Sequence, residues 1–404
     1  MAALVGALWV MPVVLAGCGS DTPRTDAGHG SPQQAGGEAA GRQPDDRQDE
    51  PRPAALKLTI TPADRAVDVS PAQPVMVTAA DGKLTEVVMT SPAGKPVKGT
   101  ISRDHSTWTS AEPLGYGKAY SVTATGTGVD GKPNSMASTF TTVKPRTLTF
   151  ASMNPTEGQV VGVGQPIAVY FDESITNKKL AEQSIAITTT PRVEGAFYWF
   201  SNKEVHWRPM DFWRAGTKVV VDIKVYGKDL GNGTFGEEDR HITFSIGDAL
   251  IAEADGASHQ MVVKINGVVA RQMPVSLGKP KAPSSNGVHV VTELFPKKIM
   301  DSSTYGVPVD SPGGYRTEVD WAVRISNGGA FVHSAPWSIA DQGHRNVSHG
   351  CINASPENAK WFFDTVKKGD VVIIHNSGGP DLKSWDGFGD WQIPWSQWVA
   401  GGQK

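Results

Sequence analysis

The sequence predicts a mainly β protein with two immunoglobulin-like sandwiches followed by a β-rich domain that has one main helix. Three observations predict this class. Runs of β-branched and aromatic residues alternate with turns along the chain, which holds 44 Gly and 28 Pro. Two segments in the middle repeat one another. One stretch near the C-terminus has the spacing of an amphipathic helix. At 404 residues the chain also exceeds a usual single core, so several domains are expected.

Residues 1–18 predict an export leader. The apolar run 2–16 is shorter than the roughly 20 residues that span a bilayer, and small residues follow it. Leu15-Ala16-Gly17-Cys18 resembles the lipobox of bacterial lipoproteins, which predicts lipidation of Cys18 and a membrane anchor. No Lys or Arg precedes the run, which weakens the match. The alternative is an ordinary export leader with an incidental cysteine.

Residues 19–54 predict a flexible linker, because they contain almost no large apolar side chain that could be buried to offset the entropy of ordering. The protein is therefore expected at the outer face of the cytoplasmic membrane or in the periplasmic space, held there by lipid. The formal net charge is −3 and no sustained basic stripe is present. This balance gives no reason to expect a nucleic-acid partner.

Residues 55–144 and 145–247 are predicted to be two diverged copies of one immunoglobulin-like unit. Short alternating runs between Gly, Pro and Asp turns are typical of small antiparallel sandwiches. Neither copy has a cysteine, so each sandwich depends on its core. Trp108 and Trp207 are predicted to be core anchors rather than ligand contacts. The matching segments are Gln73-Pro74-Val75-Met76-Val77 with Gln165-Pro166-Ile167-Ala168-Val169, and Trp108 and Gly117 with Trp207 and Gly216.

One turn of the second copy is rich in oxygen ligands. Asp229, Asn232 and Gly233 are followed by the acidic residues 237–239. Hard cations take several oxygen ligands from such loops, so a structural calcium site is one hypothesis. A solvated acidic hairpin is the alternative.

Residues 248–378 predict a β-rich domain, and residues 379–404 a Trp-rich extension. Asn266-Gly267 between two alternating runs predicts a two-residue hairpin. The main helix is predicted to follow Ser355 as its N-cap, with Pro356 in its first turn and a Lys-Lys-Gly run at its end. The tryptophans of the extension are predicted to pack on this domain as hydrophobic anchors, with sugar stacking as the alternative.

The stretch Ser348-His349-Gly350-Cys351-Ile352-Asn353 carries the predicted chemistry. Cys351 and Cys18 are the two cysteines of the chain, and if export consumes Cys18 no disulfide partner remains for Cys351. An unpaired thiol near histidines is typical of a nucleophile, because a base must draw off its proton. Gly350 leaves the nearby backbone N–H groups accessible to an oxyanion.

Three of the ten histidines, His333, His344 and His349, lie in the stretch that leads into Cys351. His333 is expected at a strand end, and His349 is two residues before the cysteine, so spacing alone leaves the choice of base open. Two other interpretations compete with a catalytic site. Cys351 could be a small buried apolar residue, or the cysteine and the three histidines could bind zinc. No paired Cys or His-x-x-x-His spacing supports zinc.

The motifs His333-Ser334 and Ser348 to Asn353 together resemble the active-site signature of the YkuD-type L,D-transpeptidases. The domain order resembles the mycobacterial members of that family, which have two immunoglobulin-like domains. The likeness includes Met300 to Tyr315 and the Trp-rich tail, so it covers nearly everything except the leader and the linker. It implies a cysteine acyltransferase that acts on peptidoglycan stem peptides and requires no cofactor for catalysis.

The resemblance also implies a role for each site residue. Cys351 is the implied nucleophile and His333 the general base and later acid, with the backbone carbonyl of Ser334 orienting the imidazole. His349 is implied to support the site. The implied oxyanion donors are Tyr315 and the backbone amides of Gly350 and Cys351. The implied substrate contacts, of which the segment from Met300 to Tyr315 forms a lid, are Met300, Tyr305, Tyr315, Gly328, Gly329, Ser334, Trp337 and Asn353.

The implied reaction has two halves. The thiol attacks the meso-diaminopimelate carbonyl of a tetrapeptide stem and expels D-Ala, and then a second diaminopimelate amine converts the thioester into a cross-link between two third residues. Carbapenem β-lactams are implied inhibitors, because their strained ring imitates the donor carbonyl. The alternatives are a cell-wall peptidase or amidase that uses water, and a wall-binding scaffold with a silent site. In the family's cation-binding turn, Asp229 and Gly233 fit, but Asn232 replaces an acid.

Overall fold

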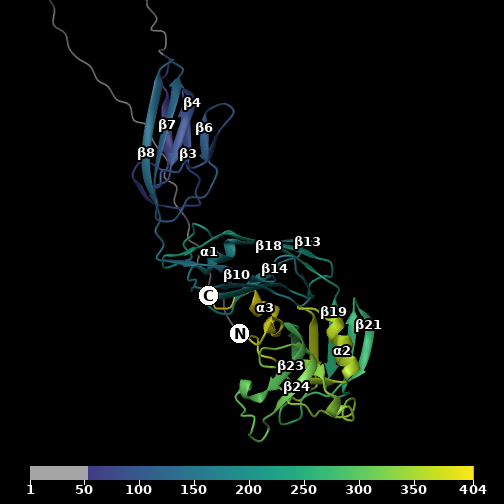
Figure 1. Cartoon of the computed structure of the whole chain (residues 1–404). Helices are drawn as coiled ribbons and strands as arrows, with labels where there is room; N and C mark the ends of the chain where they lie inside the picture. Colours follow the sequence, from purple (N-terminus) through teal and green to yellow (C-terminus); the bar gives the residue numbers. More distant parts are fainter. Residues whose placement is uncertain (1–52, 404) are drawn as a thin grey trace, which may run out of the picture. The chain divides into compact units, whose positions relative to one another are not determined.

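The structure of the chain is a computed structural model that describes residues 53–403, without the side chain of Tyr305 (Figure 1). The predicted leader, Cys18 and nearly all of the predicted linker lie outside the described residues. Strands dominate the described part of the chain, so the mainly β class is confirmed. No helix within residues 53–403 is long and apolar enough to cross a membrane.

The first sandwich consists of two four-stranded sheets that share one core. Residues from both sheets, among them Ile60, Val77, Leu84 and Phe140, form a single buried cluster. The strand orders are β1-β3-β6-β5 and β2-β8-β7-β4. The strands are β1 (Lys57–Thr61), β2 (Ala66–Val69), β3 (Met76–Ala80), β4 (Gly82–Thr90), β5 (Gly99–Ile101), β6 (Thr107–Ser110), β7 (Ala119–Gly128) and β8 (Pro133–Thr142).

The second sandwich repeats this plan with sheet orders β10-β12-β15-β14 and β11-β18-β16-β13, beside a two-stranded β17-β9 ladder. It also has a short helix that the sequence analysis did not predict, α1 (Lys178–Gln183), whose N-cap Asn177 accepts from the Leu180 amide. The strands are β9 (Thr147–Thr149), β10 (Ala151–Asn154), β11 (Val160–Val161), β12 (Ile167–Phe171), β13 (Ile185–Thr190), β14 (Gly195–Trp199), β15 (Glu204–Pro209), β16 (Lys218–Ile223), β17 (Thr234–Gly236) and β18 (Arg240–Ile246).

The two tryptophans of the repeat occupy equivalent core positions. Trp108 on β6 is 4% exposed and Trp207 on β15 is 7% exposed, which confirms the prediction that they are core anchors. Each ring lies over a glycine of the neighbouring strand. A Cβ at Gly99 would come within 2.1 Å of the Trp108 ring, and one at Gly195 within 2.2 Å of the Trp207 ring. The glycine therefore belongs to the repeated unit, because any larger residue would displace the ring.

The acidic turn is closed by its own aspartate. Asp229 Oδ1 accepts hydrogen bonds from the amides of Gly231 at 2.8 Å and Gly233 at 3.2 Å, and Asn232 has a positive φ of 57°. Within residues 53–403 there is no group of three or more His, Cys, Asp or Glu side chains that could hold a metal ion. Calcium binding at this turn stays a prediction.

The third domain, residues 248–378, is built on a five-stranded sheet, β21-β20-β19-β27-β22, and a four-stranded sheet, β23-β24-β25-β26. Helix α2 (Pro356–Thr365) packs on β24 and β25 and shares a core with both sheets through Phe362. The strands are β19 (Leu250–Asp255), β20 (Gln260–Ile265), β21 (Val268–Pro274), β22 (Gly287–Val290), β23 (Glu293–Asp301), β24 (Arg316–Arg324), β25 (Phe331–Ser334), β26 (Ile352–Ala354) and β27 (Val371–His375). The 3₁₀ turns are η1 (Ser302–Tyr305), η2 (Pro336–Ser338) and η3 (Gly389–Gln392).

Two local predictions in this domain are confirmed. Asn266 and Gly267 join β20 to β21 with φ values of 50° and 83°, the left-handed pair that a two-residue hairpin needs. Ser355 is the N-cap of α2, and its hydroxyl accepts from the Asn358 amide at 3.3 Å, with Pro356 at the first helical position.

The C-terminal extension, which includes α3 (Trp395–Trp398), packs on more than the third domain. Trp391 Nε1 donates to the Gly164 carbonyl and Trp398 Nε1 donates to the Ala196 carbonyl, both at 2.8 Å in the second sandwich. Gln392 Nε2 donates to the Val288 carbonyl of the third domain at 2.8 Å. The expectation that the tryptophans pack on residues 248–378 holds in part, because Trp391 packs on a cluster that includes Val290. The indole N–H groups of Trp391 and Trp398, however, donate to the second sandwich. Trp385 is 71% exposed, so it is not a buried anchor of the extension.

Candidate active site

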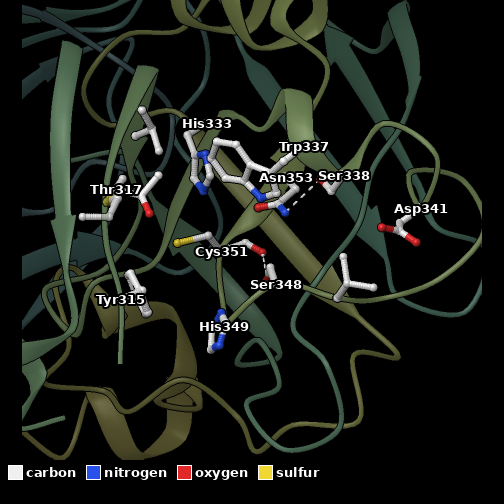
Figure 2. Close-up of a pocket in the computed structure, with 13 residues that line it drawn as sticks. Tyr315, Thr317, His333, Trp337, Ser338, Asp341, Ser348, His349, Cys351 and Asn353 are labelled. Carbon is white, nitrogen blue, oxygen red and sulfur yellow. Dashed lines mark hydrogen bonds between the residues drawn. The ribbon is translucent and has the colours of Figure 1, made fainter. Parts of the chain in front are cut away.

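The centre of the site is formed where β25 and β26 lie side by side. The two strands pair in parallel, with His333 opposite Asn353 and Val332 opposite Ile352. Cys351 immediately precedes β26, so the loop between the strands returns the cysteine to the strand that carries the histidine. Figure 2 shows His333, Cys351 and Asn353 around one pocket. Strand pairing thus brings together groups that lie far apart in the sequence.

Two cavities open at this point. The first has a volume of about 290 Å³ and the second about 540 Å³, and Tyr315 and His349 line both. Gly328 and Gly329 line the second cavity. Ser334 and Gly350 line neither, and of Tyr305 the structure describes only the backbone at the end of η1. The predicted site residues that line the first cavity are Met300, Tyr315, His333, Trp337, His349, Cys351 and Asn353.

His333 is held in one orientation by its neighbour. Its ring is buried, and Nδ1 lies 2.8 Å from the backbone carbonyl of Ser334. A carbonyl only accepts, so the proton of the neutral ring sits on Nδ1 and Nε2 is left as the basic nitrogen. Burial lowers the pKa of His333 below its usual value of 6.5, with the Ser334 hydrogen bond opposing that effect. The imidazole is therefore neutral at physiological pH.

Cys351 is also neutral in the resting site. Burial raises the pKa of its thiol to about 11. The Sγ atom donates to the Gly329 carbonyl at 3.6 Å, and within residues 53–403 no hydrogen bond joins it to His333. The resting pair is thus a thiol and an imidazole rather than a thiolate and an imidazolium. Catalytic hydrogen bonds of this kind often tighten only when substrate binds.

The turn before Cys351 engages one of its two predicted oxyanion amides. The Gly350 amide donates to Ser348 Oγ at 3.1 Å, and that hydroxyl donates in turn to the Cys351 carbonyl at 2.6 Å. The Cys351 amide has no hydrogen-bond partner within residues 53–403. Of the two backbone donors that the sequence suggested, the one at Cys351 is therefore available to a ligand.

His349 lies at the rim of the site. Its Nε2 is 2.6 Å from Lys279 Nζ, and its ring packs on Tyr315 with centroids 5.1 Å apart. Partial burial and then the Lys279 charge hold the pKa of His349 below its usual value. The Lys279 ammonium can only donate, so it already engages Nε2 of His349. Of the two histidines between which spacing left the choice of base open, His333 is therefore the one with a buried ring and with its bond to Ser334 on Nδ1 rather than Nε2.

Several residues that sequence reasoning missed also belong to the site. Asn353 Nδ2 donates to Ser338 Oγ at 3.1 Å, which holds the predicted substrate-binding amide in place. Thr317 and Asp341 line the first cavity, and Lys279 lines the second. Their positions follow from strand pairing and loop packing, so no local pattern in the sequence could have identified them. The zinc alternative is not supported, because the described residues contain no metal-binding group of His and Cys.

The chain is similar to known proteins over both of its domain types. A family model of the L,D-transpeptidase catalytic domain matches residues 250–374, and one of a bacterial Ig domain matches residues 66–229. L,D-transpeptidase 2 of Mycobacterium tuberculosis (strain CDC 1551 / Oshkosh) is 51% identical over 348 residues, which cover 86% of this chain and 85% of that protein. L,D-transpeptidase 5 of M. tuberculosis (strain ATCC 25618 / H37Rv) is 38% identical over 86% of this chain and 77% of its own length.

Solved structures give the same result. The structure of LD transpeptidase LdtMt1 in complex with imipenem is 40% identical, with a TM-score of 0.50, and the match covers 55% of this chain and 97% of that one. The matches agree on both domain types and on the enzyme class. With half of its residues identical to an L,D-transpeptidase over most of both chains, this protein belongs to the L,D-transpeptidase family of cell-wall acyltransferases.

Proposed function

We propose that the protein cross-links peptidoglycan stem peptides through a thioester on Cys351. The observation that carries this proposal is the placement of Cys351 and His333 on one cavity, with Nδ1 of His333 held by the Ser334 carbonyl. This arrangement leaves Nε2 to accept the thiol proton. The third member of a catalytic triad has the same task of orienting the imidazole.

In the first half-reaction the Cys351 thiol attacks the meso-diaminopimelate carbonyl of a tetrapeptide stem. As the S–C bond forms, the thiol proton moves to His333 Nε2 and the carbonyl electrons move to oxygen. Collapse of this intermediate breaks the C–N bond to D-Ala. The departing amine takes the proton from His333, so the enzyme is left as a thioester with a neutral imidazole.

In the second half-reaction the side-chain amine of another diaminopimelate attacks the thioester. His333 accepts the amine proton and returns it to the sulfur as the S–C bond breaks, which leaves an amide between two third residues and a free thiol. Two cavities that meet at Tyr315 and His349 give room for a donor and an acceptor stem. The lid segment borders the second cavity through Val307, Pro312 and Gly313, where it would shield the thioester from water.

The negative oxygen of each intermediate is stabilised by hydrogen-bond donors. The amide of Cys351 is the backbone donor that this arrangement favours, because the Gly350 amide is already engaged by Ser348 Oγ. Tyr315 lines the same cavity, and its phenol is the second donor in this proposal. Met300, Trp337 and Asn353 contact the donor stem from the cavity wall, and His349 supports the rim.

The test is the mass of the intact protein after incubation with a carbapenem. The thiol should open the β-lactam ring, forming an S–C bond while the ring C–N bond breaks and its nitrogen takes the proton. One equivalent should add to the full-length chain, and none should add to Cys351→Ala or Cys351→Ser. An adduct of equal yield on Cys351→Ala would contradict the proposal.

A second measurement distinguishes transfer from hydrolysis. The chain is incubated with a tetrapeptide stem, and the products are separated and weighed. Cross-linked dimer together with released D-Ala supports the transpeptidase. Release of D-Ala without any dimer would indicate a peptidase. No reaction at all would indicate a wall-binding scaffold with a silent site.

The proposed location is the outer face of the cytoplasmic membrane, with a lipid on Cys18. The family acts on the cell wall outside the cytoplasm, and the lipobox-like sequence before Cys18 supports the anchor. Labelling of growing cells with a radioactive fatty acid should mark the wild-type protein and not Cys18→Ala. Equal labelling of the wild-type protein and Cys18→Ala would contradict the proposed lipid anchor.

A further inference from the structure

A segment from outside the catalytic motif lies against the turn that carries the nucleophile. The amide of Lys279 donates to the Ser348 carbonyl at 2.9 Å, and the amide of Ser348 donates to the Leu277 carbonyl at 3.0 Å. These two backbone bonds join segments about 70 residues apart in the sequence, as the Lys279–His349 contact also does. The loop 278–284 therefore forms a fixed support beneath residues 348–350.

Ser284 is a residue of this loop whose side chain contacts the backbone of the turn. It is 1% exposed, and its Oγ lies 2.9 Å from the Gly350 carbonyl and 3.0 Å from the Gly278 amide. The Gly278 amide can only donate and the Gly350 carbonyl can only accept. The hydroxyl proton of Ser284 must therefore point at the Gly350 carbonyl, and the direction of this bond is unambiguous.

That carbonyl belongs to the same peptide unit as the Cys351 amide. A trans peptide is planar, so its C=O and N–H point in opposite directions, and a bond that fixes the oxygen also fixes the N–H. Gly350 has a φ of 120°, in a region that disfavours every residue with a Cβ, and its ideal Cβ would meet nothing closer than the Pro283 carbonyl at 4.0 Å. Within residues 53–403 the Ser284 hydroxyl is the hydrogen-bond donor to the Gly350 carbonyl, so this bond supports the peptide.

We infer that Ser284 is a positioning residue of the oxyanion hole, which aims the Cys351 amide at the substrate carbonyl oxygen. The inference rests on the proposed function. Ser284 lines neither cavity and does not touch substrate, so it acts only through the Gly350–Cys351 peptide. Its hydrogen bond also withdraws electron density from the Gly350 oxygen, which makes the Cys351 N–H a stronger donor.

The surroundings of Ser284 hold it in place. Its own carbonyl accepts from Ser377 Oγ at 2.6 Å. Two glycines close against its backbone, since a Cβ at Gly278 would lie 2.5 Å from the Ser284 nitrogen and one at Gly379 would lie 2.2 Å from its oxygen. Packing this close leaves the hydroxyl little freedom to follow a moving turn, as preorganised stabilisation of an oxyanion requires.

The experiment compares the full-length chain with Ser284→Ala during acylation by a carbapenem. Stopped-flow fluorescence separates reversible binding from the covalent step, and infrared difference spectroscopy measures the thioester carbonyl stretch of the acyl-enzyme. We expect acylation to slow by about tenfold or more, because loss of one oxyanion donor costs about 10²–10³ in rate and misalignment costs part of that. Reversible binding should change less than twofold, and the carbonyl stretch should move to higher wavenumber as its hydrogen bond weakens.

Ser276→Ala is the matched control. Ser276 is fully buried in the same segment, and its Oγ donates to the Arg345 carbonyl at 2.8 Å and accepts from the Val347 amide at 3.0 Å. Its loss should lower the melting temperature as Ser284→Ala does, but should leave the carbonyl stretch unchanged. Ser284→Thr keeps the hydroxyl and should retain the wild-type stretch, and it carries the test if Ser284→Ala does not fold.

The outcomes separate the inference from the proposed function. If the wild-type chain forms no adduct, the proposed function and the role of Ser284 both fail. If the wild-type chain reacts, the inference alone is overturned by an unchanged rate and stretch in Ser284→Ala, by the same spectral shift in Ser276→Ala, or by a shifted stretch in Ser284→Thr.

Discussion

At the scale of single residues, the nucleophile of the resting site is a protonated thiol, which is the unreactive form of cysteine. Burial raises the pKa of Cys351 to about 11 and lowers that of His333, so neither group is charged at neutral pH. The proton must therefore move as the substrate carbonyl is attacked, when the developing charge can be stabilised by the oxyanion donors. A thiol that stays protonated between turnovers is also less open to oxidation.

The alkylation of Cys351 by iodoacetamide should report this state. Because the thiolate is the reactive form, a pKa of about 11 instead of the usual 9.0 leaves about a hundredfold less of it at neutral pH. The rate should be low at pH 7 and should still be rising at pH 10. His333→Asn should leave this rate unchanged while abolishing carbapenem acylation. A plateau below pH 8 would instead indicate a thiolate paired with an imidazolium.

The acylation rate should keep its value to lower pH than a free histidine would allow. His333 accepts a proton only when it is neutral, and its pKa is lowered, so the acidic fall in rate should be centred below 6.5. Stopped-flow acylation by a carbapenem from pH 4.5 to 8 measures this midpoint, within the stability range of the drug. A midpoint above 6.5 would contradict a buried neutral base.

At the scale of elements, each sandwich has a core tryptophan whose ring packs directly on a glycine of the neighbouring strand. In the first sandwich, β5 passes so close to β6 that a Cβ at Gly99 would overlap the Trp108 ring at 2.1 Å. The second sandwich repeats this contact between β14 and β15, with Gly195 beneath Trp207. The contact lets a large ring fill the core without a disulfide, which neither sandwich has.

Gly99→Ala should therefore destabilise the first sandwich. Forcing a methyl group into a packed core typically costs about 1–3 kcal/mol, and here the ring must move. Thermal unfolding followed by calorimetry measures the loss. Gly115→Ala is the control in the same sandwich, because its nearest neighbour would be the flexible Lys118 side chain at 3.3 Å. Equal effects of the two substitutions would show that the ring contact is not responsible.

At the scale of the whole molecule, a buried ionic cluster ties the C-terminal extension to the second sandwich. His206 on β15 lies 2.7 Å from Asp390 Oδ1 and 3.0 Å from Glu204 Oε1, and Asp390 is fully buried. Burial acts to lower the pKa of His206, but the two carboxylates outweigh it and raise the pKa to about 9. The guanidinium carbon of Arg208 lies 4.6 Å from the ring centroid of Trp391 and 4.3 Å from that of Trp398, both in the extension.

Stability should therefore decline at alkaline pH. The pKa of His206 rises on folding from 6.5 to about 9, so its contribution is complete below pH 6.5 and is lost as pH rises toward 9. The melting temperature of the wild-type chain should fall across this window. His206→Gln should be less stable by about 3 kcal/mol or more at pH 6.5, because it leaves Asp390 buried without its partner, and its stability should vary less with pH. His241→Gln, at a more exposed pair with Asp222, is the control and should cost less stability than His206→Gln.

The sequence by itself determined the features that depend on local chemistry. The Asn266-Gly267 hairpin, the cap at Ser355, the alternating strands and the unpaired thiol of Cys351 all follow from residue type and spacing. The tertiary structure decided which groups meet. His333 is held through Nδ1, whereas Nε2 of His349 is engaged by Lys279. The Cys351 amide rather than that of Gly350 is available, and the extension also contacts the second sandwich. These outcomes depend on strand pairing and loop packing between distant segments, as with Ser284 and Gly350, which lie 66 residues apart. The periodicity of apolar residues predicts single helices and strands, and it does not predict contacts between distant segments.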